Sequence, residues 1–235
     1  MLNLEDVEEY RRNGFLRVKN LLSQYSVVKI RNEILTILQS PPAGLRITRE
    51  ELAPYPVRKI RNICGASRRI KEICLNPILI STAEALLGGP VNFCGDQVLF
   101  KVARFGSAKP LHQDAAYFRS SPPDAIVTFW CALHKADEEN GCMHYVCASH
   151  QNGIVDHQDP DNSPHLIAKY PRVVLVPVQA SPGDVIAHSS LTLHSTPANK
   201  SHHDRWAILL HFIHVDAEFP PSSSVVASVE RVFSI

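Results

Sequence analysis

The chain has 235 residues, of which 45% are hydrophobic and 20% are charged, and its formal net charge at pH 7 is +1. A near-neutral chain without a basic stripe argues against a nucleic-acid-binding protein, and no apolar stretch approaches the length that a membrane-spanning helix needs. A single soluble domain over residues 1–235 is expected, because all-β domains of this length routinely fold as one unit.

Three helices are predicted in the first ninety residues. Residues 4–13 form a short helix that Gly14 closes, and Ser23 caps a second helix that stops at Pro41. Pro77 opens a third helix over residues 78–87, which ends at the glycine pair 88–89.

Short β-rich runs separated by turn signals follow this helical part. The predicted strands are Val98–Phe105, Ala125–Leu133, Met143–Ala148, Arg172–Gln179, Asp184–His188 and Trp206–Val215. Helices followed by antiparallel-looking strands predict a mainly β fold with flanking helices. We expect a jelly-roll (cupin-like) core over residues 91–216, backed by the helical residues 1–90.

The six cysteines do not form a Cys-x-x-Cys pair, and the acidic N-terminal residues do not resemble a signal peptide. Scattered cysteines of this kind are typical of free thiols in a reducing compartment. We therefore expect a cytoplasmic protein that does not contact membranes or nucleic acids; its oligomeric state is left open.

Four polar side chains indicate the chemistry: His112, Asp114, His194 and Arg205. Two imidazoles and one carboxylate on one side of an iron ion leave three positions open, enough for a bidentate cosubstrate and dioxygen. A later arginine can hold the far carboxylate of a 2-oxo acid, because a guanidinium is a planar, permanently charged donor. The pattern predicts a non-haem iron(II) oxygenase.

The His-x-Asp triplet alone is weak, because it also occurs at His157/Asp159, His202/Asp204 and His214/Asp216. Only the pair at 112 and 114 follows an apolar run and has both a distant histidine and a later cation. The segment around residue 157 reads as an exposed loop, and the other two pairs lie too near the C-terminus. We interpret all three as surface residues.

From Asp96 to Asp216 the chain resembles the phytanoyl-CoA dioxygenase family of Fe(II)/2-oxoglutarate-dependent oxygenases, whose core is a double-stranded β-helix. The resemblance lies in Lys-Pro-Leu-His-Gln-Asp-Ala-Ala-Tyr-Phe at 109–118, Glu-Asn-Gly-Cys at 139–142, Ala-Ser-His at 148–150, the glycine-to-histidine stretch 183–194, Asn199 and Arg205. It covers about half of the chain.

The resemblance implies a role for each site residue. His112, Asp114 and His194 are the expected catalytic metal ligands, and Arg205 with the Thr196 hydroxyl would bind the far carboxylate of 2-oxoglutarate. The residues expected to line the cosubstrate pocket are Gln97, Gln113 and Trp130. A basic residue also contacts the cosubstrate in some relatives, and the candidates here are Arg58, Lys59, Arg61 and Lys101.

Simpler interpretations of some residues stay open. Trp130 would pack in the core whether or not a ligand binds, and the two glutamines could be plain polar groups of the strand face. Arg205 could pair with Asp204 or Asp184 at the surface.

The resemblance implies hydroxylation, desaturation or cyclisation of an unactivated C–H bond, with release of succinate and CO2. The expected cofactors are Fe(II), 2-oxoglutarate and O2, with ascorbate as the reductant in vitro. Related halogenases carry a small residue where Asp114 stands, so its carboxylate favours a hydroxylase. The chain ends without a peroxisomal Ser-Lys-Leu signal, so we expect a small metabolite, as in secondary metabolism, as the substrate.

The loop over residues 152–171 is expected to cover the pocket. Two other classes stay open: a cupin-like metalloenzyme without 2-oxoglutarate and a non-catalytic jelly-roll binding protein.

Overall fold

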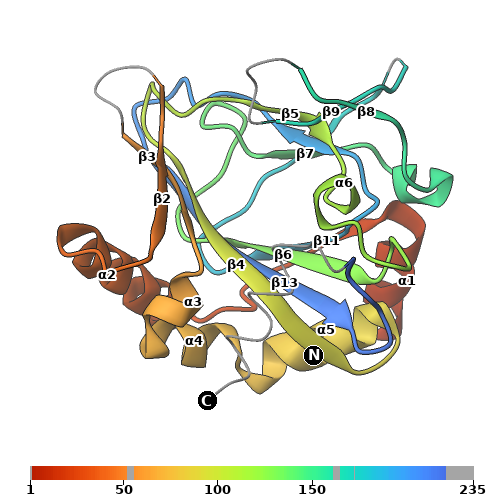
Figure 1. Cartoon of the computed structure of the whole chain (residues 1–235), viewed down its shortest axis with the longest axis horizontal. Coiled ribbons are helices and arrows are strands. Elements are labelled where there is room, and N and C mark those ends of the chain that lie inside the picture. The colour runs from red at the N-terminus through yellow and green to blue at the C-terminus, as the bar shows by residue number, and fades with distance from the viewer. Residues whose placement is uncertain (1, 52–55, 161–164, 172, 221–235) are drawn as a thin grey trace.

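Two antiparallel sheets form the centre of the computed structural model, which describes residues 2–51, 56–160, 165–171 and 173–220. The major sheet has the order β1 (Phe15–Val18), β11 (Val185–Ser189), β6 (Ile126–Ala132), β13 (Arg205–His214), β4 (Val91–Lys101), β3 (Val57–Arg61) and β2 (Arg46–Arg49). The minor sheet has the order β10 (Val176–Val178), β7 (Met143–Tyr145), β12 (His194–Thr196) and β5 (Lys109–His112). Figure 1 shows β5 and β7 above the diagonal strands β4, β13 and β6. The predicted jelly-roll fold class is confirmed.

The helices are α1 (Leu4–Asn13), α2 (Gln24–Gln39), α3 (Ile63–Ala66), α4 (Arg68–Cys74), α5 (Pro77–Leu87) and α6 (Ala115–Phe118), followed by a 3-10 turn at Ser149–Asn152. The three helices predicted from the sequence have the expected ends. Ser23 accepts a hydrogen bond from the Ser26 amide at the start of α2, and Gly14 and Gly88 adopt left-handed conformations at the ends of α1 and α5. No helix of the described residues is long and apolar enough to cross a membrane.

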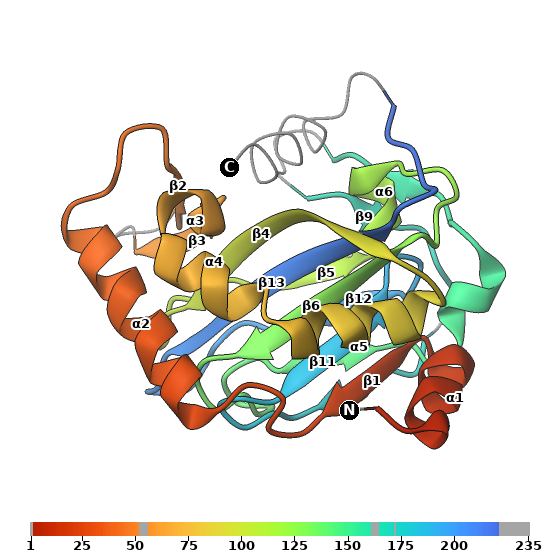
Figure 2. The same cartoon turned by 90° about the horizontal axis from the view of Figure 1, so that it is seen from below.

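Strand β6, in the middle of the major sheet, is buried on both faces. Along β6, Phe129 packs with the helices on the outer face, whereas Trp130 packs with Tyr145 of the minor sheet on the inner face. Figure 2 shows α4 and α5 against the outer face. Burial of both faces explains why β6 is continuously apolar instead of alternating.

The predicted helical part, residues 1–90, is incomplete, because β1, β2 and β3 also lie there. β1 pairs with β11, and β3 pairs with β4, so this part extends the core sheet. Short strands at a sheet edge carry little periodicity, and the sequence therefore did not reveal them.

The strand predicted at Val98–Phe105 is displaced: β4 spans Val91–Lys101, and the amides of Phe105 and Gly106 both donate to the Val102 carbonyl in a turn. Phe105 is exposed, so its apolar side chain was a misleading sign of a strand. Strands β7 and β10 are also shorter than predicted, and residue 172 lies outside the described residues.

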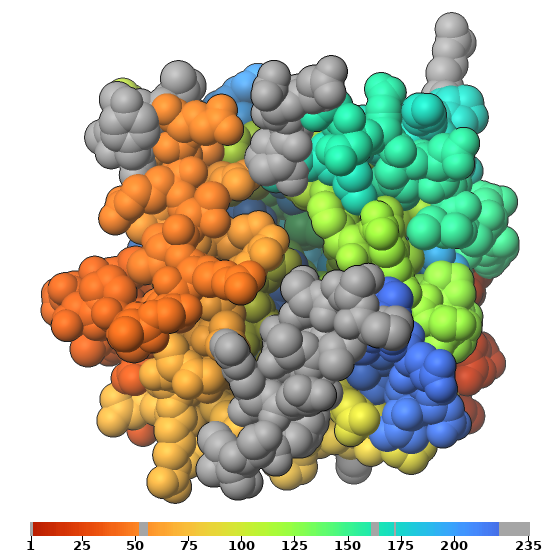
Figure 3. Space-filling view, in the orientation of Figure 1, coloured from red at the N-terminus to blue at the C-terminus, as the bar shows by residue number. Residues whose placement is uncertain are grey.

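The loop over residues 152–171 contains a small hairpin of β8 (His157–Gln158) and β9 (Ile167–Ala168). Residues 161–164 of this predicted lid lie outside the described residues. In Figure 3, a hollow opens between the orange surface of β2 and β3 and the yellow-green surface around α6. This hollow leads between the two sheets.

Candidate active site

Three predicted metal ligands meet where the two sheets face each other. His112 ends β5 and is directly paired with His194, the first residue of β12, so their rings lie 4.2 Å apart. Asp114 follows at the start of α6, and its Oδ1 lies 3.8 Å from the Nε2 atom of each histidine. One donor atom from each residue can be chosen so that all three lie within 4.8 Å of one another. Within the described residues, no other histidine, cysteine, aspartate or glutamate cluster of three is this close.

Backbone carbonyls fix the orientation of both imidazoles. Nδ1 of His112 lies 2.8 Å from the Pro110 carbonyl, and Nδ1 of His194 lies 2.9 Å from the Thr192 carbonyl. Each Nδ1–H donates to its carbonyl, which leaves the Nε2 lone pairs directed at the shared centre. Burial lowers the pKa of His112 well below its usual value and that of His194 to about 4, so both are neutral ligands near pH 7.

A buried hydrogen-bond network holds the carboxylate. Thr128 Oγ1 donates to Asp114 Oδ2 at 2.8 Å, and His188 Nε2 donates to the same oxygen at 3.2 Å. His188 Nδ1 in turn lies 3.0 Å from the Tyr145 hydroxyl, which donates to it, and Thr128 is within 3.0 Å of His211 Nδ1. Because both donors use Oδ2, Oδ1 is the oxygen left for a metal.

Burial alone would raise the pKa of Asp114, but the His188 hydrogen bond and the neighbouring imidazoles hold it well below its usual value. The carboxylate is therefore ionised, which is the form that binds a divalent cation.

Arg205 lies at the other end of the inner face. It begins β13, is only 1% exposed, and has its Cζ 5.1 Å from the centre of the Trp130 ring. Its Nε and Nη1 atoms, and Nε1 of Trp130, have no hydrogen-bond partner among the described residues. Burial lowers the pKa of Arg205 to about 10, so it remains a cation near pH 7. A buried cation without a counter-charge is unfavourable, and an incoming carboxylate would supply one.

An apolar floor connects the two ends. Side chains two residues apart on a strand share a face, so Arg205, Ala207, Leu209 and His211 of β13 all face inward. His211 contacts the network that holds the carboxylate, and Leu209 is paired with Trp130 on β6. A dicarboxylate with its oxo-acid end at the metal can thus direct its far carboxylate toward the guanidinium. The open alternative of a surface ion pair for Arg205 is wrong, because the side chain is buried.

Gln97 and Thr196 lie on strands that carry other predicted site residues or pair with them. Gln97 on β4 is directly paired with Leu209, next to Trp130 in the same row of the sheet. Thr196 is two residues beyond His194, on the same face of β12, and is buried. Their contacts with a cosubstrate stay predictions.

Gln113 has a different use. Its Nε2 donates to the carbonyls of Leu191 at 2.6 Å and Gly153 at 2.8 Å, and its Oε1 accepts from the Val155 amide at 2.9 Å. Both of its N–H groups therefore anchor loops, because residue 113 points away from the face shared by its two neighbours. We leave Gln113 out of the proposed pocket.

Lys101 also has its donors committed. Its Nζ donates to the carbonyls of Ser107 at 2.5 Å and Pro197 at 2.6 Å. Burial, and then the neighbouring Arg205, lower its pKa to about 6. Lys101 thus fixes the backbone around Arg205.

The three rival His-x-Asp pairs do not form a cluster within the described part of the chain. His157 accepts a hydrogen bond from the Gln113 amide, and His202 contacts Arg104. His214 lies 3.7 Å from Asp216, whose side chain is 86% exposed. The interpretation as surface residues is incomplete, because His157 is half-buried and bonded to the Gln113 amide.

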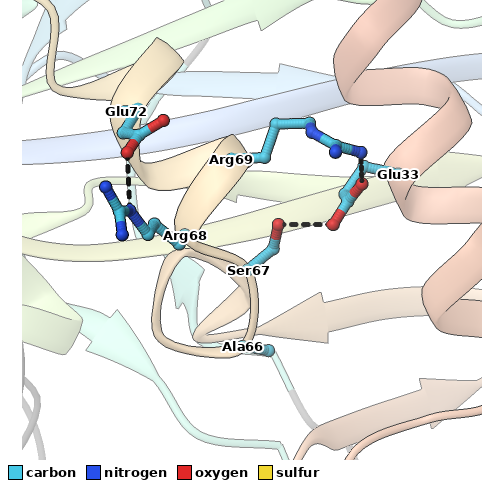
Figure 4. Close-up of a pocket in the computed structure, with 6 residues that line it drawn as sticks. All are labelled: Glu33, Ala66, Ser67, Arg68, Arg69 and Glu72. Atoms are coloured by element: carbon cyan, nitrogen blue, oxygen red, sulfur yellow. Dashed lines mark hydrogen bonds and ion pairs between the residues drawn. The ribbon is translucent and has the colours of Figure 1, made fainter.

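A surface hollow of about 440 Å³ lies elsewhere, between α2 and α4. Figure 4 shows that its charges pair with one another: Glu33 accepts hydrogen bonds from Ser67 and Arg69, and Glu72 accepts one from Arg68. Because these charged side chains are hydrogen-bonded to one another, the hollow is not a candidate for the functional site.

Comparison with known proteins decides the family. Residues 10–207 match the family described as phytanoyl-CoA dioxygenase (PhyH). The chain belongs to the PhyH family. The peroxisomal phytanoyl-CoA dioxygenase of Bos taurus is 29% identical over 242 residues, which cover 93% of this PhyH chain and 71% of the relative.

Solved structures agree with this assignment. The 2-oxoglutarate (alpha-ketoglutarate)-dependent carbocyclase SnoK has a TM-score of 0.81 at 26% identity, and the alignment covers 95% of this chain and 88% of SnoK. The epimerase SnoN, in complex with Fe3+, alpha-ketoglutarate and nogalamycin RO, has a TM-score of 0.78 at 22% identity with the same coverage. The PhyH chain is an iron- and 2-oxoglutarate-dependent oxygenase that uses O2, as predicted. The buried unpaired guanidinium and the three clustered donors fit these cofactors, and a cupin without 2-oxoglutarate or a non-catalytic binding protein is disfavoured.

The sequence did not single out Thr128, and it assigned His188 no specific contact. Both lie in apolar β-rich runs, where a polar residue buried on the inner face must find a partner. An isolated polar residue in such a run was the available signal.

Proposed function

We propose that this PhyH-family oxygenase hydroxylates an unactivated C–H bond of a small metabolite and couples the reaction to conversion of 2-oxoglutarate into succinate and CO2. Desaturation or cyclisation, begun by the same hydrogen abstraction, is the second possible outcome. One observation carries the proposal: an intact cluster of His112, Asp114 and His194 shares an inner face with the buried, unpaired Arg205.

In the proposed mechanism, the three clustered residues hold the metal. The two Nδ1–H groups donate to backbone carbonyls and keep both Nε2 atoms aimed at it, while Thr128 and His188 hold Oδ2 of Asp114 so that Oδ1 is the ligand. Bound iron(II), with 2-oxoglutarate and O2, supplies the oxidising power for C–H cleavage.

The protein also positions the cosubstrate. Arg205 would hold the far carboxylate through Nε and Nη1, which have no partner among the described residues, and Thr196 would add a hydroxyl donor. The Trp130 ring and the apolar side chains of Ala207 and Leu209 exclude water between the two ends, which strengthens these electrostatic contacts.

The carboxylate of Asp114 supports an oxygenation outcome. Its Oδ2 is held by two donors, so the side chain is a fixed ligand and the position is not open to a halide. This favours hydroxylation over halogenation.

Two further expectations belong to the proposal. Pairing of β1 with β11 and of β3 with β4 supports one catalytic domain over residues 1–235. A reducing compartment such as the cytoplasm is supported by the six cysteines, all free thiols.

The test uses purified protein with iron(II), ascorbate and 2-oxoglutarate. It should release succinate slowly without a substrate and faster when a screened metabolite is accepted. The H112A variant should lose both iron binding and succinate release. H202A is the matched control, because His202 belongs to a rival triplet outside the cluster. Equal iron binding by wild type and H112A would overturn the assignment.

A further inference from the structure

Cationic and imidazole side chains gather beside the metal ligands, on strands from both sheets. We call this cluster the basic rim; its members are Arg58, Lys59 and Arg61 of β3, Lys109 of β5, and His165 just before β9. Apart from the exposed Arg61 they are half-buried, so a solute can reach them. Figure 3 shows the hollow between the surfaces of β2–β3 and α6, the elements that flank this cluster.

Short contacts join the rim from one sheet to the other. Arg58 Nη1 lies 3.0 Å from His165 Nε2, and Lys109 Nζ lies 2.9 Å from His165 Nδ1. Lys109 also donates to the Tyr117 hydroxyl at 2.6 Å.

Arg58, His165 and Lys109 together offer more hydrogen-bond donors than acceptors in these contacts. A neutral imidazole accepts a hydrogen bond at only one nitrogen, yet His165 meets a guanidinium at one nitrogen and an ammonium at the other. At least one contact is therefore donor to donor while Lys109 is charged. An acceptor with several oxygens, placed between Arg58 and Lys109, would relieve this excess.

Within residues 2–51, 56–160, 165–171 and 173–220, few acidic side chains act on the cations of the rim. Among the ion pairs of the described residues, none includes Arg58, Lys59, Arg61 or Lys109. Asp114 is the acidic group that acts on Lys109, and its charge is directed to the metal and to the donors on Oδ2. Burial, and then mutual repulsion, lower the pKa of Lys59 to about 8.

The rim adjoins the metal ligands, and its Lys109 is also the strand partner of Thr196 on β12. The Tyr117 ring, which Lys109 contacts, lies edge-on to the His112 ring with 5.7 Å between their centres. Arg205, by contrast, lies at the end of β13 beside Lys101. A ligand held by Lys109 beside Tyr117 would therefore lie next to His112.

We propose that the primary substrate carries an oxyanion group, a carboxylate, phosphonate or phosphate, which Arg58 and Lys109 bind beside Tyr117. The proposal rests on the proposed function, because it assumes that the cluster of His112, Asp114 and His194 is the reaction centre. Charge-assisted hydrogen bonds to the oxyanion would orient the substrate before C–H cleavage.

Calorimetric binding of small probes tests the proposal on protein loaded with Ni(II), a redox-inert substitute, and saturating 2-oxoglutarate. The probes are methylphosphonate, acetate and the neutral isostere acetamide. We expect methylphosphonate and acetate to bind and acetamide not to bind. K109M and R58Q should each weaken binding about tenfold or more, whereas K109R should restore much of it.

The matched control is R68Q, which removes one positive charge from exposed α4, where Arg68 pairs with Glu72. It should leave probe binding unchanged. Equal probe affinity in wild type, K109M and R58Q would overturn the proposal. Probe binding that occurs only when 2-oxoglutarate is left out would also overturn it, because it would assign the rim to the cosubstrate.

Metal-dependent 2-oxoglutarate binding is measured first. It distinguishes failure of the proposed function from failure of the proposed substrate class. Its absence in the wild type would contradict the proposed function. Its presence without any oxyanion binding would contradict only the substrate class. In a metabolite screen, succinate release should be accelerated by anionic compounds and not by their neutral amides or esters.

Discussion

The charged side chains at the two ends of the inner face, Asp114 and Arg205, differ in their hydrogen-bond partners. At one end, Asp114 receives hydrogen bonds from Thr128 and His188, which are themselves supported by His211 and Tyr145. At the other end, two nitrogens of Arg205 have no partner among the described residues. The Asp114 carboxylate is thus held by hydrogen bonds within the protein, whereas the Arg205 guanidinium lacks a counter-ion among the described residues.

This difference separates a fixed metal ligand from a binding site for an exchanging cosubstrate. A ligand that must stay in place benefits from donors that fix its free oxygen. A guanidinium already paired with a protein carboxylate would have to break that pair before binding 2-oxoglutarate. In the proposed function, the unpaired buried cation would cost stability in the free protein, and binding of the cosubstrate would offset that cost.

The largest effect should come from removing a ligand at the metal end. D114A should abolish iron-dependent succinate release and greatly weaken iron binding, because two neutral imidazoles cannot balance a divalent cation. Iron content after dialysis and succinate release measure these effects. The exposed Asp216 provides the control variant D216A, which should behave like wild type. Retention of tightly bound iron by D114A would contradict the role of Asp114 as a metal ligand.

Replacing the unpaired cation should separate ligand affinity from stability. In R205M, the affinity for 2-oxoglutarate should fall about 100-fold because the carboxylate loses its charged partner. The free protein should become more stable by roughly 1–3 kcal/mol, since a buried unpaired charge is replaced by an apolar side chain. Denaturant unfolding with and without 2-oxoglutarate measures both quantities. Equal loss of iron in R205M and D114A would mean that Arg205 is structural.

Removal of one supporting hydrogen bond should have a smaller effect at the metal end. T128V keeps the side-chain shape but loses the donor to Asp114, so iron affinity should fall about 10–100-fold. The affinity of metal-saturated protein for 2-oxoglutarate should stay as in wild type. The buried Thr82 of α5, which donates to the Ile78 carbonyl, gives the matched control T82V. If T82V and T128V lose iron equally, the effect belongs to general packing.

The sequence predicted α1, α2, α5 and the longer strands because their signals are local, whereas it did not predict the short helices α3, α4 and α6. Ser23, Gly14 and Gly88 mark helix ends through their own backbone or side-chain chemistry. β5 and β12 are short and their apolar patterns are weak, yet they carry two of the three clustered residues. Motif spacing predicted the residues, whereas the pairing of His112 with His194 required the fold.

Contacts across the sheets could not be predicted. Nothing local to Thr128 or His188 indicates that both donate to one oxygen of Asp114. The same holds for the basic rim, where His165 meets Arg58 and Lys109 from two different strands. Gln113 is a different case, because the family resemblance implied a cosubstrate contact, whereas its side-chain amide donates to the backbone carbonyls of two loops.

The smallest expected effect concerns the basic rim. Like Arg205, the rim has more hydrogen-bond donors than acceptors, but its Lys109 side chain changes charge near neutral pH. Burial lowers the pKa of Lys109 to about 7; the charge of Asp114 opposes this shift, and the cations Lys59, Arg58 and Arg61 add to it. A lysine is charged below its pKa, so acetate should bind more tightly at pH 6.5 than at pH 8.5, by a few-fold, while acetate itself stays ionised throughout. Calorimetry on Ni(II)- and 2-oxoglutarate-loaded protein measures this, with K109M expected to show a flatter profile. Tighter acetate binding at the higher pH would contradict a role for the Lys109 charge.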